Sequence, residues 1–217
     1  MFERLFGARA QSTLIDEAFE TVSGMLSHGG KMYDIAIGML LDDRSPEIDL
    51  DTLDDRIDDG EREVRRTVLQ HLAVDPRHDL VASLILVSIV QDAERIGDFA
   101  RGLGDLVELK KAPLEGEFAD DLRQIAERIR PSFEACAAAF GDANATGAGE
   151  VIEHHVETKV VVLDYVSRLA ASDLLADPAV VYSSAARMLG RVSAHLSNIA
   201  SSVVQPYDRI RHGDEEV

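Results

Sequence analysis

Apolar residues recur every three or four positions along almost the whole chain, which is the spacing of one face of an α-helix. The first series begins near Ile15 and continues past Gly29-Gly30 without a change of spacing, so we expect one long helix with a soft point at the glycines. Its apolar members are Ile15, Phe19, Val22, Met25, Leu26, Met32, Ala36, Met39 and Leu40.

Prolines divide the rest of the first half. Ser45-Pro46 marks the first break, and a second apolar series from Leu53 to Leu72 ends at Asp75-Pro76, because the residue before a proline disfavours the helical conformation. A third helix is expected from about Arg77 to Lys110-Lys111, just before Ala112-Pro113.

The same order recurs in the second half. A fourth apolar series from Phe118 to Phe140 is interrupted at Pro131, and residues 141–149, which are rich in Gly, Ala and Asn, are predicted to form a loop. Two further helices are expected, divided at Asp177-Pro178.

An internal alignment supports a duplication, which is the usual origin of such self-similarity. A shift of 96 residues pairs Glu61 with Glu157, Val64 with Val160, Arg95 with Arg191, and Ile96 with Val192. An accidental match of helical patterns is the alternative. We predict an all-α fold of two tandem three-helix bundles, residues 1–113 and 114–217, with six helices in total.

Composition and charge narrow the function. Of 217 residues, 46% are hydrophobic and only 5% aromatic, with 15 Gly and 6 Pro, which suits a helical core. The net charge of -18 argues against binding of nucleic acid or anionic lipid, which need basic surfaces. The apolar run from Leu80 to Val90 is too short to span a bilayer, so we expect a cytoplasmic protein without membrane insertion.

Two carboxylates stand out in the third helix. Glu94 and Asp98 lie four residues apart and therefore share a face, where like charges disfavour the helix by a few tenths of a kcal/mol. Glu61 lies on the apolar stripe of the second helix beside Gly60, which leaves room for a close approach. If the three converge, they form an oxygen-rich site of the kind that hard cations prefer.

The same stretch resembles a known family. Glu94-Arg95-Ile96-Gly97-Asp98 is similar to the "ERIGD" signature of PhoU proteins, the helical regulators of bacterial and archaeal phosphate uptake. Residues 57–61 (Ile-Asp-Asp-Gly-Glu) resemble the family's "IN-x-LE", and residues 195–200 (His-Leu-Ser-Asn-Ile-Ala) resemble its "H-x-x-NIA".

The resemblance covers nearly the whole chain and implies both a fold and a role. It implies two three-helix bundles and regulation by contact with a phosphate transporter component, a phosphate-sensing histidine kinase, or both, and it leaves a homo-oligomer open. It also implies a divalent or trivalent metal ion (Fe, Mn, Mg, Zn or Ni) on the acidic face, held by Glu61, Glu94 and Asp98.

The sequence departs from the family in two places. Arg65 stands where the second-helix motif has a carboxylate, and Gly190 and Ala194 stand where the second repeat would have its acidic pair. A second site would have to use other groups, namely His154, His155, Glu157 and His195. The two adjacent histidines and Asp92 are expected on solvated faces, and His195 is expected to hydrogen-bond within the bundle.

Alternatives remain at this stage. A salt-bridge network with Arg65 and Arg95 would satisfy the three carboxylates without metal, and so would simple exposure. The protein would then be a metal-free helical scaffold or oligomerisation module. A metal-dependent enzyme or metal store is less favoured, since the chain has no GxxxxGK[ST] loop, no Cys/His cluster and no Glu-x-x-His pair.

Overall fold

The computed structural model describes residues 13–210, and these form helices joined by short connections, without a strand. The elements are α2 (Thr13–Asp42), α3 (Leu50–Val74), α4 (Leu80–Asp105), the 3₁₀ turn η1 (Leu106–Leu109), α5 (Glu117–Ile129), α6 (Pro131–Gly141), α7 (Ala145–Ala170), α8 (Ala176–Val204) and η2 (Tyr207–Arg209). The all-α prediction is confirmed.

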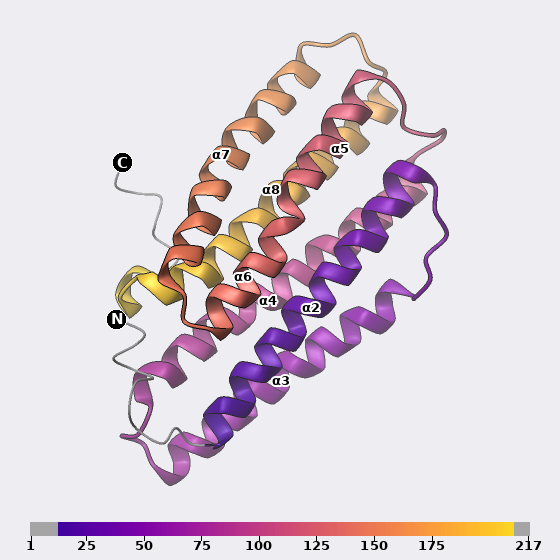
Figure 1. The fold of residues 1–217 in the computed structure, drawn as a ribbon. Helices are drawn as coiled ribbons and strands as arrows, with labels where there is room; N and C mark the ends of the chain where they lie inside the picture. Colours follow the sequence, from indigo (N-terminus) through magenta and orange to yellow (C-terminus); the bar gives the residue numbers. More distant parts are fainter. Residues whose placement is uncertain (1–12, 211–217) are drawn as a thin grey trace.

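The helices form two groups (Figure 1). One group is α2, α3 and α4; in the other, α5 and α6 follow one another as a single helix broken at Arg130 and pack with α7 and α8. The groups join where α4 packs on α8 and α2 packs on α6. The predicted pair of three-helix bundles is therefore confirmed.

The chain passes from the first group to the second through residues 110–116, which include Pro113. A division into independent units at residues 1–113 and 114–217 stays a prediction, because the two groups share an extensive interface.

The glycine pair in the first helix serves close packing. Helix α2 runs unbroken through Gly29 and Gly30, as predicted. A Cβ on Gly29 would lie 3.0 Å from Ile96 Cγ2 of α4, and one on Gly30 would lie 3.4 Å from Phe133 Cδ1 of α6. The missing side chains thus let α2 approach both its own group and the other one.

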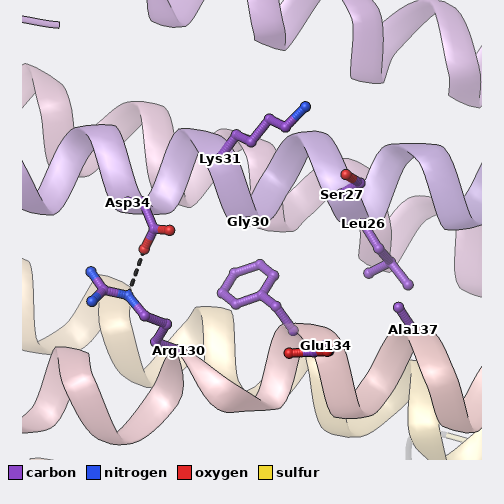
Figure 2. Close-up of a pocket in the computed structure, with 9 residues that line it drawn as sticks. Leu26, Ser27, Gly30, Lys31, Asp34, Arg130, Glu134 and Ala137 are labelled. Atoms are coloured by element: carbon purple, nitrogen blue, oxygen red, sulfur yellow. Dashed lines mark hydrogen bonds and ion pairs between the residues drawn. The ribbon is translucent and has the colours of Figure 1, made fainter. Parts of the chain in front are cut away.

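A hollow of about 330 Å³ lies beside this contact, between α2 and the α5–α6 break. Figure 2 shows Asp34 and Arg130 pointing toward one another across it, and their ion pair has an Oδ1–Nε distance of 2.6 Å. This exposed pair links the two groups at the point where Pro131 interrupts the fourth helix.

Two predicted helix boundaries were wrong. Residues 141–149 are mostly helical, because the Asn144 side chain accepts hydrogen bonds from the backbone N–H groups of Thr146 and Gly147 (3.1 and 3.2 Å) and caps α7. Asp177-Pro178 does not divide the last two helices but lies in the first turn of α8, where a proline interrupts no intrahelical hydrogen bond.

The repeat needs two offsets instead of one. The shift of 96 holds for α4 and α8, where Ile96 and Val192 are both fully buried. It fails for α3 and α7, because it pairs the buried Val64 with Val160, which is 65% exposed. A shift of 98 matches the buried positions of these two helices: Leu53 with Val151, Ile57 with His155, and Gly60 with Thr158.

Candidate metal site on the acidic seam

Five carboxylates lie along the contact between α3 and α4, and we call this group the acidic seam. The glycine of the ERIGD motif explains why the helices come so close, since a Cβ on Gly97 would lie 2.9 Å from Ile57 Cδ1 of α3. The members of the acidic seam are Asp54, Asp58 and Glu61 of α3 and Glu94 and Asp98 of α4.

The predicted ligands are only partly buried. The side chains of Glu61 and Glu94 are 18% and 19% exposed, and that of Asp98 is 39% exposed. Glu61 therefore lies toward the neighbouring helix, as its place on the apolar stripe predicted, while Asp98 lies at the edge of the seam.

Arginines neutralise part of the acidic seam from within each helix. Arg65 pairs with Glu61 (Nη2–Oε1, 2.7 Å) four residues away on α3. Arg95 pairs with Asp98 (Nη1–Oδ2, 2.8 Å) and lies 3.6 Å (Nε–Oε2) from Glu94 on α4. An ion pair from Arg65 across to Glu94, which the salt-bridge alternative included, is absent from the described pairs, so Glu94 has the weakest compensation.

The electrostatics of Glu94 show this excess of negative charge. Burial and the neighbouring Asp98 raise the pKa of Glu94 to about 7, and Glu61 and Asp58 add to the increase while Arg95 opposes it. Burial also raises the pKa of Asp54, with Asp58 and Asp98 adding to the effect and Arg101 opposing it. A cation at this position would relieve the repulsion.

The ligand atoms are not gathered as a finished metal site would have them. Within residues 13–210, the group of three His, Cys, Asp or Glu side chains whose ligand atoms all lie within 4.8 Å is His71, His78 and Asp79, at the turn between α3 and α4. Sequence reasoning missed it, although two histidines and an aspartate around Asp75-Pro76 were the available signal. His71 Nε2 lies 2.9 Å from the His78 carbonyl oxygen, and His78 Nδ1 lies 2.7 Å from Asp79 Oδ2, so these groups pair with one another.

The residues considered for a second site do not come together. His154 Nδ1 lies 2.9 Å from Ser132 Oγ, and Glu157 forms an ion pair with Arg128. His155 was expected to be exposed but is only 8% exposed, because its Nδ1 lies 3.0 Å from Ser193 Oγ of α8.

His195 lies apart from these residues, at the contact between α4 and α8. Its Nδ1 lies 2.8 Å from Asp92 Oδ1, and Asn198 Nδ2 donates to the same oxygen at 2.9 Å. His195 does form a hydrogen bond, but its partner Asp92 belongs to the other group of helices, so the bond connects the two bundles and does not lie within one of them. The expected exposure of Asp92 was wrong, because its side chain is buried in this contact.

We expect Glu94→Gln to stabilise the metal-free protein at pH 8 and to be close to neutral at pH 4. The raised pKa means that folding favours the protonated carboxyl; this contribution is complete below about pH 4.5 and is lost as the pH rises through about 7. After solvent screening, we expect a gain of about 1–2 kcal/mol at pH 8 in urea unfolding with a chelator present.

A matched control is Glu63→Gln, an exposed position of α3 outside the acidic seam. It should show no gain that grows with pH. A Glu94→Gln difference that is the same at pH 4 and pH 8 would contradict the electrostatic account.

Within the described part of the chain, no helix is both long and apolar enough to cross a membrane.

Comparison with known proteins gives a likeness in structure and none in sequence. No protein-family model matches the chain, and no curated protein sequence matches it. The structure is similar to that of PhoU from Pseudomonas aeruginosa, with a TM-score of 0.76 and 21% identity over 88% of this chain and 95% of that one. It is also similar to the phosphate transport system regulatory protein PhoU from Streptococcus pneumoniae, with a TM-score of 0.64 and 19% identity over 88% of each chain. The chain therefore has the fold of the PhoU structures, as its ERIGD motif predicted.

Proposed function

We propose that this protein regulates phosphate transport or phosphate-responsive signalling by contact with other proteins. The observation that carries the proposal is the match of its fold to two PhoU structures over 88% of the chain, with the ERIGD residues placed on the contact between α3 and α4. One of those proteins is described as a regulator of the phosphate transport system. Similarity of fold alone does not determine function. The ERIGD motif and its position between α3 and α4 are therefore a second, separate support for the proposed function.

The proposed partners are a phosphate transporter component, a phosphate-sensing histidine kinase, or both, reached from the cytoplasm. A net charge of -18 favours basic partner surfaces, and such contacts weaken with salt because charges are screened over about 8 Å at roughly 0.15 M. A role without catalysis is part of this proposal.

The direct test is deletion of the gene under phosphate-replete conditions. We expect phosphate uptake or phosphate-regulated expression to rise, and the intact gene to restore both. Unchanged uptake and expression, together with pulldowns that recover neither a transporter component nor a kinase, would overturn the regulatory role.

We further propose that Glu61, Glu94 and Asp98 hold a hard cation. Oxygen-only donors fit Mg, Mn or Fe better than Zn or Ni, which favour nitrogen and sulfur ligands. The raised pKa of Glu94 supports a site that lacks positive charge. The pairs of Arg65 with Glu61 and Arg95 with Asp98 instead favour the second candidate, a metal-free helical scaffold.

The double variant Glu94→Ala/Asp98→Ala separates the two candidates. If the acidic seam binds metal, Mn²⁺ at about 100 times its dissociation constant should stabilise the wild type by about 2.7 kcal/mol and leave the variant unchanged. In metal-free protein the same change should be neutral or stabilising, because it removes like-charge repulsion.

The control is Asp59→Ala/Glu63→Ala, a pair with the same spacing on the exposed face of α3. It should keep the full response to Mn²⁺. If the Glu94/Asp98 variant is destabilised equally with and without metal in thermal unfolding, the arginine pairs account for the site and the metal proposal fails.

A further inference from the structure

The second half of the protein contains a counterpart of the acidic seam with the opposite charge. Equivalent positions of the two halves are aligned by a shift of 98 residues between α3 and α7 and by a shift of 96 residues between α4 and α8. These shifts pair Glu61 with Lys159, Gln91 with Arg187, Glu94 with Gly190, Arg95 with Arg191, and Asp98 with Ala194. Each carboxylate named as a ligand is thus replaced by a cation or a small residue.

These residues line a groove between α7 and α8, which we call the α7–α8 groove. Its volume is about 440 Å³, and no Asp or Glu is among its lining residues. Its cations are Lys159, Arg187 and Arg191, and its apolar lining includes Val162, Leu163 and Val166. At about 1.5 Å per residue, the helical span from His155 to Val166 is roughly 16 Å, enough to cover about three turns of another helix.

One cation of the groove, Arg191, contacts side chains of α4 and α8. The Arg191 guanidinium lies over the Phe99 ring of α4, 5.7 Å from its centroid, and its Nη2 lies 3.3 Å from His195 Nε2. Arg187 lies one turn earlier on the same face of α8. In a chain of charge -18, a groove lined by three cationic side chains and no carboxylate is a local reversal of sign.

An exposed apolar face of α7 adjoins the groove. Val156, Val160 and Leu163 are 48%, 65% and 68% exposed, and their spacing of four and three places them on one side of the helix. Leu163 also lines the groove, so the apolar face continues into it. Contiguous exposed apolar residues bordered by charge mark interaction surfaces more often than a single exposed leucine does.

We propose that the α7–α8 groove receives an acidic amphipathic segment of a partner protein, an inference that rests on the proposed function. Apolar side chains of that segment would pack on Val162, Leu163 and Val166, while its carboxylates would meet the cations along the rim, as in helix-in-groove recognition. The apolar walls disfavour a small inorganic anion, which needs polar contacts on most sides.

The test is a selection of random 16-residue displayed peptides on the wild type and on Lys159→Glu/Arg187→Glu. We expect the wild type to enrich acidic peptides with apolar residues at intervals of three and four. A labelled copy of the best peptide should lose at least about tenfold in affinity with the double variant, measured by fluorescence anisotropy. Arg66→Glu/Arg77→Glu, which changes the net charge equally on exposed positions of the first half, should bind like the wild type.

A second pair of variants tests the apolar part without altering charge. Leu163→Gln should weaken the peptide severalfold, whereas Leu69→Gln, at a leucine that is 69% exposed on α3, should not. Enrichment without an acidic bias, or equal binding by the groove variants, would overturn the proposal.

Two other occupants of the groove would overturn the proposal. The first is a second copy of this chain, shown by self-association in sedimentation experiments that Lys159→Glu/Arg187→Glu abolishes. The second is a lipid surface, shown by binding to phosphatidylglycerol vesicles that the same double variant abolishes. Full complementation of a deletion phenotype by the groove variants would reject the groove and keep the regulatory function; absence of any deletion phenotype would reject that function instead.

Discussion

Asp92→Ala is expected to lower the free energy of unfolding by about 3 kcal/mol, because it removes one partner of a buried charged network. The Asp92 side chain is 2% exposed, and its Oδ1 accepts hydrogen bonds from His195 Nδ1 and Asn198 Nδ2. Without the carboxylate, the buried His195 and the half-buried Asn198 both lose their acceptor, and an unsatisfied buried group costs about 1–3 kcal/mol. Urea unfolding at neutral pH measures the loss.

Asp105→Ala, at an exposed position of the same helix, is the control and should change stability by less than about 0.5 kcal/mol. His195→Ala should cost less when Asp92 is already alanine, with a coupling of about 1 kcal/mol or more in the double-mutant cycle. A loss below about 1 kcal/mol for Asp92→Ala would show that the network is not needed to hold α4 on α8.

This network gives a physical meaning to the "H-x-x-N" pattern near the end of the chain. His195 and Asn198 lie three residues apart on α8 and therefore face the same way. Both bond to Asp92, which lies two residues before the start of the ERIGD motif at Glu94. The motifs of the two halves thus meet at one carboxylate, where they connect the bundles to each other.

The sequence predicted the helices well because their burial is periodic. The series through Gly29-Gly30 kept its helical spacing, and the structure has one helix there. The errors fell where a single side chain decides the outcome. The Asn144 side chain caps α7 by accepting hydrogen bonds from its first N–H groups. Pro178 is tolerated because the N–H groups in the first turn of a helix have no intrahelical acceptor, so a proline there removes no hydrogen bond of the helix.

The candidate site was predicted in part for a similar reason. Spacing alone predicted that Glu94 and Asp98 share one face of the helix. Glu61, on the neighbouring helix, is one of the charges that raise the pKa of Glu94. Asp92 could not be found this way, since its partner His195 lies 103 positions away and the chain contains 40 acidic residues. The shift of 96 residues that was predicted between α3 and α7 is two residues too small. The sequence did not reveal this, because the two shifts differ in which buried positions they pair and not in the residue identities that they match.

Gly97→Ala is expected to destabilise the protein, whereas Gly24→Ala is expected to stabilise it, although both replace a helical glycine. A Cβ on Gly97 would lie 2.9 Å from Ile57 Cδ1. Because Ile57 is fully buried, either its terminal methyl group must rotate within the packed core or α3 must shift, and we expect a cost of about 1–3 kcal/mol. A Cβ on Gly24 meets no atom within 4 Å, so the usual gain of about 0.5–1 kcal/mol remains.

The same pair of variants connects packing with the acidic seam. Because Gly97 sets the distance between α3 and α4, moving α3 away should lessen the influence of Glu61 and Asp58 on Glu94 and lower its pKa from about 7. Gly24→Ala should leave that pKa unchanged. Urea unfolding and carboxyl titration by NMR measure both effects, and a Gly97→Ala protein as stable as Gly24→Ala would show that the motif glycine does not hold the two helices together.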